Sequence, residues 1–284
     1  NLNDLAMTDT LNVGKPIRDT LGFDVPCAAD LFESYAGLPD KIAGKCYGTL
    51  PDNVTMQFRE PMGVIAAIVP WNFPLMIGAW KLAPALAMGN SVVLKPAETS
   101  SLSLLKLAGI CAEAGLPDGV LNVVTGQGAV AGEALALSYD VDALVFTGSG
   151  GVGRRLLEYS ARSNLKRVYL ELGGKSPNIV FADAPDLAKA AKVSAMGIFR
   201  NSGQVCVAGS RLLVERSVHD DFVALMAAEA EKLKVGDPLD LETQIGAVNS
   251  IPQLEGNLGF VEKALAEGAE AVTGGGRILQ ETGG

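Results

Sequence analysis

Histidine is almost absent from this chain of 284 residues, which has only His219. That residue lies in a charged stretch at the start of an amphipathic run, a setting typical of a solvated helix end. A protease with a cysteine and histidine pair would depend on this one side chain, so the sequence disfavours that class. A base, where the chemistry needs one, is therefore expected to be a carboxylate.

Cysteine is scarce as well, with Cys27, Cys46, Cys111 and Cys206. These four form no close pair and have no metal-ligand spacing. A chain of this length can bury a large core and needs no disulfide staples. We therefore expect free thiols in a reducing, cytoplasmic setting, and no metal site.

The sequence also lacks long hydrophobic runs and basic clusters. Pro70, Pro74, Lys81 and Pro84 interrupt the best apolar candidates, so none approaches the roughly eighteen residues that cross a bilayer. A net charge of -9 would repel a polyanion. Hydrophobic residues make up 48% and charged residues 19%, a globular composition rich in buried strands. Neither a membrane nor a nucleic acid is an expected partner.

From residue 61 onward, short β-branched runs alternate with longer amphipathic stretches. This alternation predicts an α/β fold with a doubly wound parallel sheet, covered by helices on both faces. The predicted strands cover residues 64–69, 91–94, 120–124, 143–146, 167–170, 178–181 and 211–214. The predicted helices cover residues 75–88, 101–114, 129–137, 151–163, 186–199 and 218–233. Ligands of such folds bind at the carboxyl ends of the strands.

The length predicts two domains. Residues 43–60 differ from the rest, because they are polar, contain Pro51, and place Val54, Met56 and Phe58 at alternate positions. This pattern predicts a β-hairpin at an edge, suited to pairing with another subunit.

Cys206 is the best candidate nucleophile. It lies between a predicted helix and a predicted strand, and Gly203 and Gly209 leave backbone room for a substrate. Attack on a carbonyl needs a thiolate near neutral pH, and therefore an electropositive or hydrogen-bonded loop and a base.

Glu171 is the candidate base. It interrupts an apolar run and is followed by Leu172 and two glycines, which predict a turn with an open backbone. A carboxylate at the end of a buried strand loses hydration and becomes a stronger base. The alternative is an ion pair between Glu171 and Lys175 or Arg167.

Asn72 lies between Pro70 and Pro74 at the end of the first predicted strand. The two prolines predict a rigid turn that holds the amide in a fixed direction, where it could donate to an oxyanion. The alternative is an amide that hydrogen-bonds within its own turn.

The other predicted strand ends carry patterns suited to a nucleotide. Lys95 and Glu98 follow the second strand, where a ribose or phosphate lies in doubly wound sheets, and Glu98 would repel a 2′-phosphate. Residues 126–132 and 146–153 are rich in glycine, and the second of these runs opens a helix, as a pyrophosphate site requires. Each run is also compatible with a tight strand-to-helix turn.

Five motifs, in this order along the chain, resemble those of the aldehyde dehydrogenase superfamily. They are Pro70-Trp71-Asn72-Phe73-Pro74, Lys95-Pro96-Ala97-Glu98, Phe146-Thr147-Gly148-Ser149, Leu170-Glu171-Leu172-Gly173-Gly174-Lys175 and Gly203-Gln204-Val205-Cys206. The resemblance implies Cys206 as the nucleophile, Glu171 as the general base, and Asn72 with the Cys206 backbone amide as oxyanion donors. It also implies NAD, in preference to NADP, as the cofactor.

The resemblance assigns a larger set of residues to the cofactor. They are Val69, Pro70, Trp71, Lys95, Pro96, Ala97, Glu98, Gly128, Gly132, Phe146, Thr147, Gly148, Ser149, Val152, Gly153, Leu172 and Gly173. It further implies a Rossmann-like cofactor-binding domain over residues 1–42 and 62–173, an oligomerisation hairpin over 43–61, and an incomplete catalytic domain over 174–284. A homodimer or homotetramer is the expected assembly.

The implied reaction is oxidation of an aldehyde to a carboxylic acid through a thiohemiacetal and a thioester on Cys206, with hydrolysis by water. Two alternatives stay open, namely release of the thioester to CoA or phosphate, and a nucleotide-binding assembly module without activity. The motifs are closest to members that oxidise amino- or glutamylamino-aldehydes, with betaine aldehyde and simple aldehydes as other candidates. We also expect the chain to be an internal portion of a longer enzyme.

Overall fold

The computed structural model describes residues 1–282. Its contacts divide the chain into two compact units. The first holds Asn1–Leu5 and Gly22–Leu172, and the second holds Ala6–Leu21 and the residues from Gly173 onward. Two domains were predicted, but residues 6–21 were assigned to the cofactor-binding domain, whereas their contacts group them with the second unit. The functional assignment of the domains stays a prediction.

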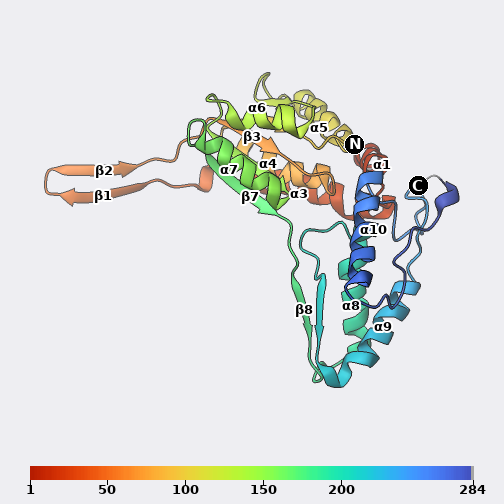
Figure 1. The fold of residues 1–284 in the computed structure, drawn as a ribbon. Coiled ribbons are helices and arrows are strands. Elements are labelled where there is room, and N and C mark those ends of the chain that lie inside the picture. The colour runs from red at the N-terminus through yellow and green to blue at the C-terminus, as the bar shows by residue number, and fades with distance from the viewer. Residues whose placement is uncertain (283–284) are drawn as a thin grey trace. The chain divides into compact units, whose positions relative to one another are not determined.

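The first unit contains a five-stranded parallel sheet (Figure 1). Its strands are β3 (Val64–Ile68), β4 (Ser91–Lys95), β5 (Leu121–Val123), β6 (Ala143–Gly148) and β7 (Arg167–Leu172). The order in space is β5-β4-β3-β6-β7, and every pair is parallel. The strand order reverses between β3 and β6, which is where doubly wound sheets bind ligands. The predicted α/β parallel sheet is confirmed.

Helices precede these strands or connect them, and the connecting helices pack on the sheet. They are α1 (Leu2–Val13, shared between the units), α3 (Val25–Ala36), α4 (Pro74–Ala87), α5 (Leu102–Glu113), α6 (Glu133–Leu137) and α7 (Gly150–Ala161). A π-helical turn, Gly128–Gly132, precedes α6, so the predicted helix 129–137 has two parts. On one face, Ile68, Leu144 and Phe146 pack with Ala136 of α6 and Leu156 of α7. Leu144 and Phe146 share this face because side chains two residues apart on a strand point to the same side of the sheet.

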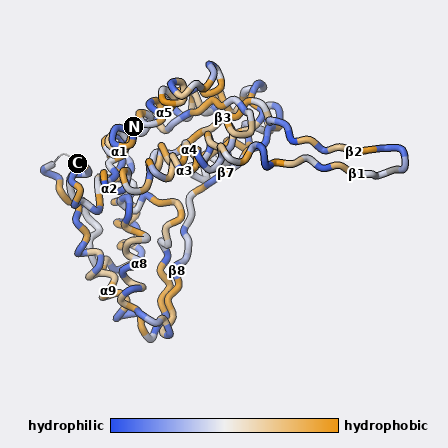
Figure 2. Tube along the Cα trace, turned by 180° about the vertical axis from the view of Figure 1, so that it is seen from behind, coloured by the Kyte–Doolittle hydropathy of each residue, from blue (hydrophilic) through white to orange (hydrophobic). Residues whose placement is uncertain are grey.

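The predicted hairpin is present in the first unit. Strands β1 (Lys45–Leu50) and β2 (Asn53–Gln57) pair antiparallel, with Lys45 opposite Gln57. The hairpin extends away from the five-stranded sheet (Figure 1), and hydrophobic stretches alternate with hydrophilic ones along it (Figure 2). Val54 and Met56 are 64% and 60% exposed. Pairing of this hairpin with another subunit stays a prediction.

The second unit contains a two-stranded parallel sheet of β8 (Pro177–Val180) and β9 (Arg211–Val214). Its helices are α2 (Ile17–Asp19), α8 (Leu187–Phe199), α9 (His219–Glu231) and α10 (Ile251–Ala266). Val180, Ala191 and Phe222 form its small buried core. Sequence reasoning missed α10, although Ser250 caps it by accepting a hydrogen bond from the Gln253 backbone N–H, a typical start signal.

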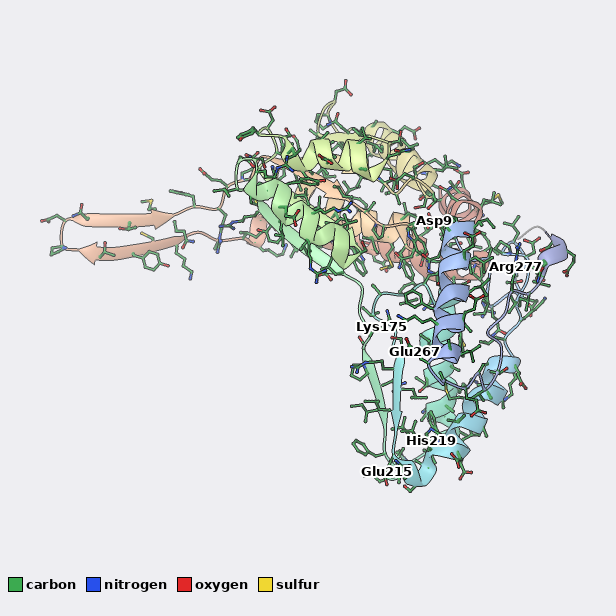
Figure 3. All side chains as sticks on the ribbon, in the orientation of Figure 1. Asp9, Lys175, Glu215, His219, Glu267 and Arg277 are labelled. Carbon is green, nitrogen blue, oxygen red and sulfur yellow. The ribbon has the colours of Figure 1, made fainter. Side chains whose placement is uncertain are left out.

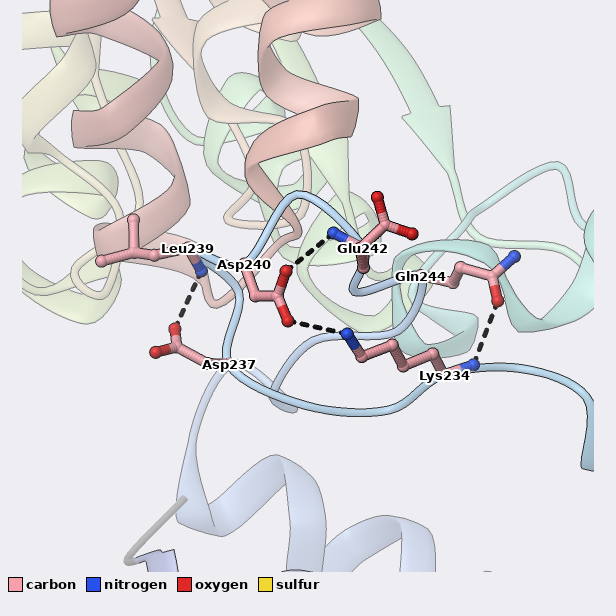
Figure 4. A network of polar contacts seen from close by, with 6 residues as sticks. All are labelled: Lys234, Asp237, Leu239, Asp240, Glu242 and Gln244. Atoms are coloured by element: carbon pink, nitrogen blue, oxygen red, sulfur yellow. Dashed lines mark hydrogen bonds and ion pairs between the residues drawn. The ribbon is translucent and has the colours of Figure 1, made fainter.

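The loop after α9 is held by polar contacts (Figure 4). Asp240 accepts from Lys234 Nζ at 2.8 Å and from the Glu242 backbone N–H at 2.9 Å. The Lys234 ammonium, with that backbone donor, holds the pKa of Asp240 below its usual value. Gln244 Oε1 accepts from the Lys234 N–H, and Asp237 Oδ1 accepts from the Leu239 N–H.

No helix among residues 1–282 combines the length and the apolar character that a membrane crossing requires.

Candidate functional site

The carboxyl ends of the five parallel strands lie along one edge of the sheet in the first unit. Ile68 at the end of β3 is in register with Lys95 on one side and with Phe146 on the other. Thr147 of β6 is opposite Glu171 of β7. The predicted cofactor residues of this unit lie at the ends of these strands, in the loops that follow, or at the starts of the next helices. The fold therefore brings them to the same edge of the sheet.

Lys95 and Glu98 form a buried cation beside an exposed anion. Lys95 is 2% exposed, and its Nζ donates to the Pro96 carbonyl oxygen at 2.8 Å and lies 3.6 Å from Glu98 Oε1. The Gly128 backbone N–H donates to the same Glu98 oxygen at 2.5 Å. Partial burial alone would raise the pKa of Glu98, but the backbone amides of Glu98 and Gly128 and the Lys95 charge outweigh it and lower that pKa. Glu98 is therefore a carboxylate acceptor at neutral pH.

The glycine run after β6 opens α7. Ser149 is the N-cap, and its Oγ accepts from the Val152 backbone N–H at 3.4 Å. Glycine is needed at two points, because a Cβ on Gly148 would lie 2.4 Å from Phe146 Cζ and one on Gly153 would lie 3.0 Å from Leu172 Cδ2. A capped start of a twelve-residue helix, with backbone free of side chains, is suited to a phosphate.

The substitution Gly148→Ala is expected to lower the free energy of unfolding by about 1–3 kcal/mol, because the added methyl displaces the buried Phe146 ring. Gly151→Ala is the matched control, since a Cβ there meets no atom within 4 Å and alanine favours a helix. Thermal or urea unfolding of the two variants measures the difference. Equal stabilities would show that the ring moves aside at no cost.

Asn72 is half-buried in the loop between β3 and α4. The Val69 N–H donates to the Lys95 carbonyl oxygen at 3.1 Å, which extends the strand pairing up to Pro70. Pro74 is the first residue of α4, and the Phe73 carbonyl already accepts from the Ile77 N–H. The backbone on both sides of Asn72 is thus fixed by secondary structure, as the two prolines predict.

Glu171 lies near the end of β7 and is exposed. The expected burial of this carboxylate is therefore wrong, because β7 is the edge strand of the sheet and most of its side chains face outward. Arg167, a predicted alternative partner, lies four residues away on the same strand, about 13 Å along it. The salt bridges within 4 Å among residues 1–282 do not include one between Glu171 and Arg167.

Lys81 of α4 lies within Coulombic range of Glu171, a proximity that sequence reasoning missed. Burial lowers the pKa of Lys81, and the Coulombic attraction of Glu171 opposes that shift. In the sequence Lys81 stood out only as a charge that interrupts an apolar helix. A charge within a predicted buried helix could have indicated a partner at the sheet edge.

Cys206 is a half-exposed free thiol in the second unit. It lies between the 3₁₀ turn Arg200–Gly203 and β9, and the Ala208 N–H donates to the Val205 carbonyl oxygen around it. A Cβ on Gly174 would lie 3.5 Å from the Cys206 carbonyl oxygen, so the backbones of these two residues are adjacent. Gly173, a predicted cofactor residue, belongs to this same unit.

His219 lies beyond the other end of β9 from Cys206. It is the first residue of α9, where its Nδ1 lies 2.8 Å from Asp220 Oδ1 on the surface. Figure 3 shows His219 and Glu215 at one end of the β8–β9 pair and Lys175 toward the other end. The prediction of a solvated helix end is confirmed, and the length of β9 separates this imidazole from Cys206.

A sequence profile described as "Aldehyde dehydrogenase family" matches residues 1–284. The chain belongs to the aldehyde dehydrogenase family. The NADP/NAD-dependent aldehyde dehydrogenase PuuC of Escherichia coli K12 is 52% identical over 265 residues, which cover 93% of this chain and 54% of that protein.

Two solved structures of family members are equally similar. A γ-glutamyl-γ-aminobutyraldehyde dehydrogenase from Burkholderia cenocepacia is 50% identical with a TM-score of 0.96, and an indole-3-acetaldehyde dehydrogenase bound to NAD+ is 51% identical with a TM-score of 0.97. Both matches extend over 100% of this chain but over only 57% of the solved chain. This aldehyde dehydrogenase chain thus spans about half the length of the relatives that it matches.

Proposed function

We propose that the protein to which this chain belongs oxidises an aldehyde to a carboxylic acid with NAD. The observation that carries the proposal is the gathering of the predicted cofactor residues at the carboxyl edge of a sheet whose strand order reverses between β3 and β6. The family and the named cofactor of a relative support it, as does an accessible free thiol in the second unit.

The residues of the first unit fit a dinucleotide. The start of α7 offers backbone N–H groups and the helix dipole to the pyrophosphate, and Gly151 leaves open space there, since a Cβ on it would meet no atom within 4 Å. The Glu98 carboxylate is suited to accept hydrogen bonds from ribose hydroxyls, and its charge disfavours a 2′-phosphate. A bound nicotinamide would supply the hydride acceptor of the reaction.

In the proposed mechanism the Cys206 thiolate adds to the aldehyde carbonyl and forms a thiohemiacetal. The Asn72 side chain and the Cys206 backbone N–H donate to the oxyanion. After oxidation to a thioester, Glu171 removes a proton from water, which attacks the acyl carbon and releases the carboxylate.

Lys81 is the proposed electrostatic partner of the base. Its ammonium lies close enough to Glu171 for Coulombic attraction.

Product analysis separates this proposal from its alternatives. The complete protein to which the chain belongs is incubated with NAD or NADP and a panel of amino-aldehydes, glutamylamino-aldehydes, betaine aldehyde and simple aldehydes, with and without CoA or phosphate. Free carboxylic acid and reduced NAD are the expected products. Acyl-CoA or acyl phosphate would favour an acylating dehydrogenase. No turnover together with slow alkylation of Cys206 by iodoacetamide would favour a nucleotide-binding assembly module.

Two further proposals concern the substrate class and the assembly of the protein. Relatives of equal identity act, by their names, on a glutamylamino-aldehyde and on an indole aldehyde, so identity alone does not choose between them. We propose the amino- and glutamylamino-aldehydes as substrates. We also propose that the exposed hairpin β1–β2 mediates a homodimer or homotetramer.

Asn72→Ala is expected to slow turnover by roughly 100-fold or more, since one oxyanion donor contributes about 3 kcal/mol to barrier lowering. Affinity for NAD is expected to stay near the wild-type value, because the substitution leaves the α7 start and Glu98 intact. Steady-state rates and fluorescence titration of the cofactor measure the two effects. Asn122→Ala, on exposed β5 in the same unit, is the control. Weaker NAD binding in Asn72→Ala with an unchanged rate would contradict the assigned role.

A further inference from the structure

The loop that leads to Cys206 has an unusual backbone. Asn201 and Ser202 have φ values of 52° and 56°, and Gly203 follows with a φ of 74°. A Cβ disfavours this left-handed region, so two such residues in succession persist only where contacts hold them. The contacts at this turn come from the loop itself and from a segment about 45 residues further along the chain.

Gln204 closes the turn from within. Its backbone N–H and its Nε2 both donate to the Asn201 carbonyl oxygen at 3.0 Å. Asn201 Nδ2 donates in return to the Gln204 carbonyl oxygen at 3.3 Å. The two residues are only 9% and 1% exposed, so solvent cannot replace these hydrogen bonds unless the loop opens.

Gln204 also attaches the turn to a distant segment. Its Oε1 accepts from the Asn249 backbone N–H at 3.0 Å, across 45 residues of chain. The Ser202 hydroxyl makes a second link by donating to the Gly246 carbonyl oxygen at 2.9 Å. The receiving segment is itself held, because the Ala247 N–H donates to the Gly14 carbonyl oxygen at 3.0 Å. All of these residues belong to the second unit.

We propose that Gln204 is a positioning residue for the Cys206 nucleophile, an inference that rests on the proposed function of Cys206. Cys206 follows Gln204 by two residues, so the directions of its thiol and its backbone N–H depend on how the turn is held. An amide suits this role because one end donates to Asn201 while the other accepts from Asn249. Gln204 acts through the loop and is not assigned any contact with substrate.

The first test measures how the thiol is presented and needs no turnover. The rate of alkylation of Cys206 by iodoacetamide is followed by peptide mass spectrometry and divided by the rate at the exposed Cys46, which lies in the other unit. Gln204→Met removes both polar ends while keeping the length of the side chain, and is expected to lower this ratio roughly 10-fold. Gln204→Glu keeps the acceptor for Asn249 and is expected to restore part of the loss.

Gln253→Met is the matched control, because its side-chain amide hydrogen-bonds to Asn257 within α10. It is expected to leave the ratio unchanged. A ratio that stays the same or rises in Gln204→Met would overturn the proposal, as would an equal fall in the control. If Gln204→Met fails to fold, Gln204→Glu compared with wild type carries the test, with an unchanged ratio again decisive against it.

The second test separates positioning from a purely structural role. With an aldehyde and NAD, Gln204→Met is expected to lower kcat roughly 10-fold while KM stays near wild type, whatever the change in the thermal midpoint. A lower thermal midpoint with unchanged kcat and alkylation ratio would make Gln204 a structural residue only. Failure of the proposed function is detected separately, by wild-type rates in a variant without the Cys206 thiol.

Discussion

Replacing Cys206 by serine is expected to reduce the rate of aldehyde oxidation by roughly 10,000-fold or more. Without the thiol, neither the thiohemiacetal nor the thioester can form. A serine hydroxyl remains protonated near neutral pH, and the proposed role of Glu171 is to activate water and not the nucleophile. Formation of reduced NAD is followed by absorbance, and the acid product by chromatography. Binding of NAD is expected to persist, because the predicted cofactor residues lie in the first unit, with Gly173 as the exception.

Cys46→Ser is the matched control for this experiment. Cys46 is also a free thiol, but it is exposed on β1, opposite Met56 in the hairpin. Its replacement is expected to leave the rate unchanged. Wild-type-like rates in Cys206→Ser would contradict the covalent mechanism, independently of how the cofactor binds.

Glu171→Gln is expected to stop the reaction after oxidation and before hydrolysis. The first turnover needs the thiol and the oxyanion donors, so about one equivalent of reduced NAD per active site should form in a burst. The following steady rate should fall by roughly 100- to 10,000-fold, the range that a general base contributes. Stopped-flow absorbance and intact-protein mass spectrometry detect the burst and the acyl adduct on Cys206.

Glu158→Gln on α7 is a suitable control, because Glu158 is likewise an exposed carboxylate of the first unit. It should show neither a burst nor a slow steady phase. A slow reaction without a burst in Glu171→Gln would place the role of Glu171 before hydrolysis. Fast steady turnover would show that another group activates the water.

Most of the regular structure follows from local pattern. The predicted strands at 64–69 and 211–214 match β3 and β9 to within one residue, because short apolar runs bounded by turn residues are too short for helices. The helix α10 was not predicted, although its serine cap and proline at the start are local signals. Two glycines within it, at 256 and 259, weaken the helical pattern.

The environment of the site residues depended on neighbours far along the chain. Glu171 was expected to be buried because its strand is apolar, but β7 has a partner on one side only, and its carboxylate is exposed. Lys81 was not predicted to lie near Glu171, since the two are ninety residues apart and meet only through the sheet order. The same holds for Gln204 and Asn249.

The amino-acid sequence by itself determined the alternation of strands and helices, the glycines at the start of α7, the accessible nucleophile candidate and the family resemblance, because these depend on side-chain type at short spacing. The tertiary structure alone decided the strand order, the register of Thr147 with Glu171, the charge beside Glu171 and the hydrogen bonds that hold the Cys206 loop. Such contacts join residues tens of positions apart, and only packing of the whole unit selects them from the many pairings that local pattern allows.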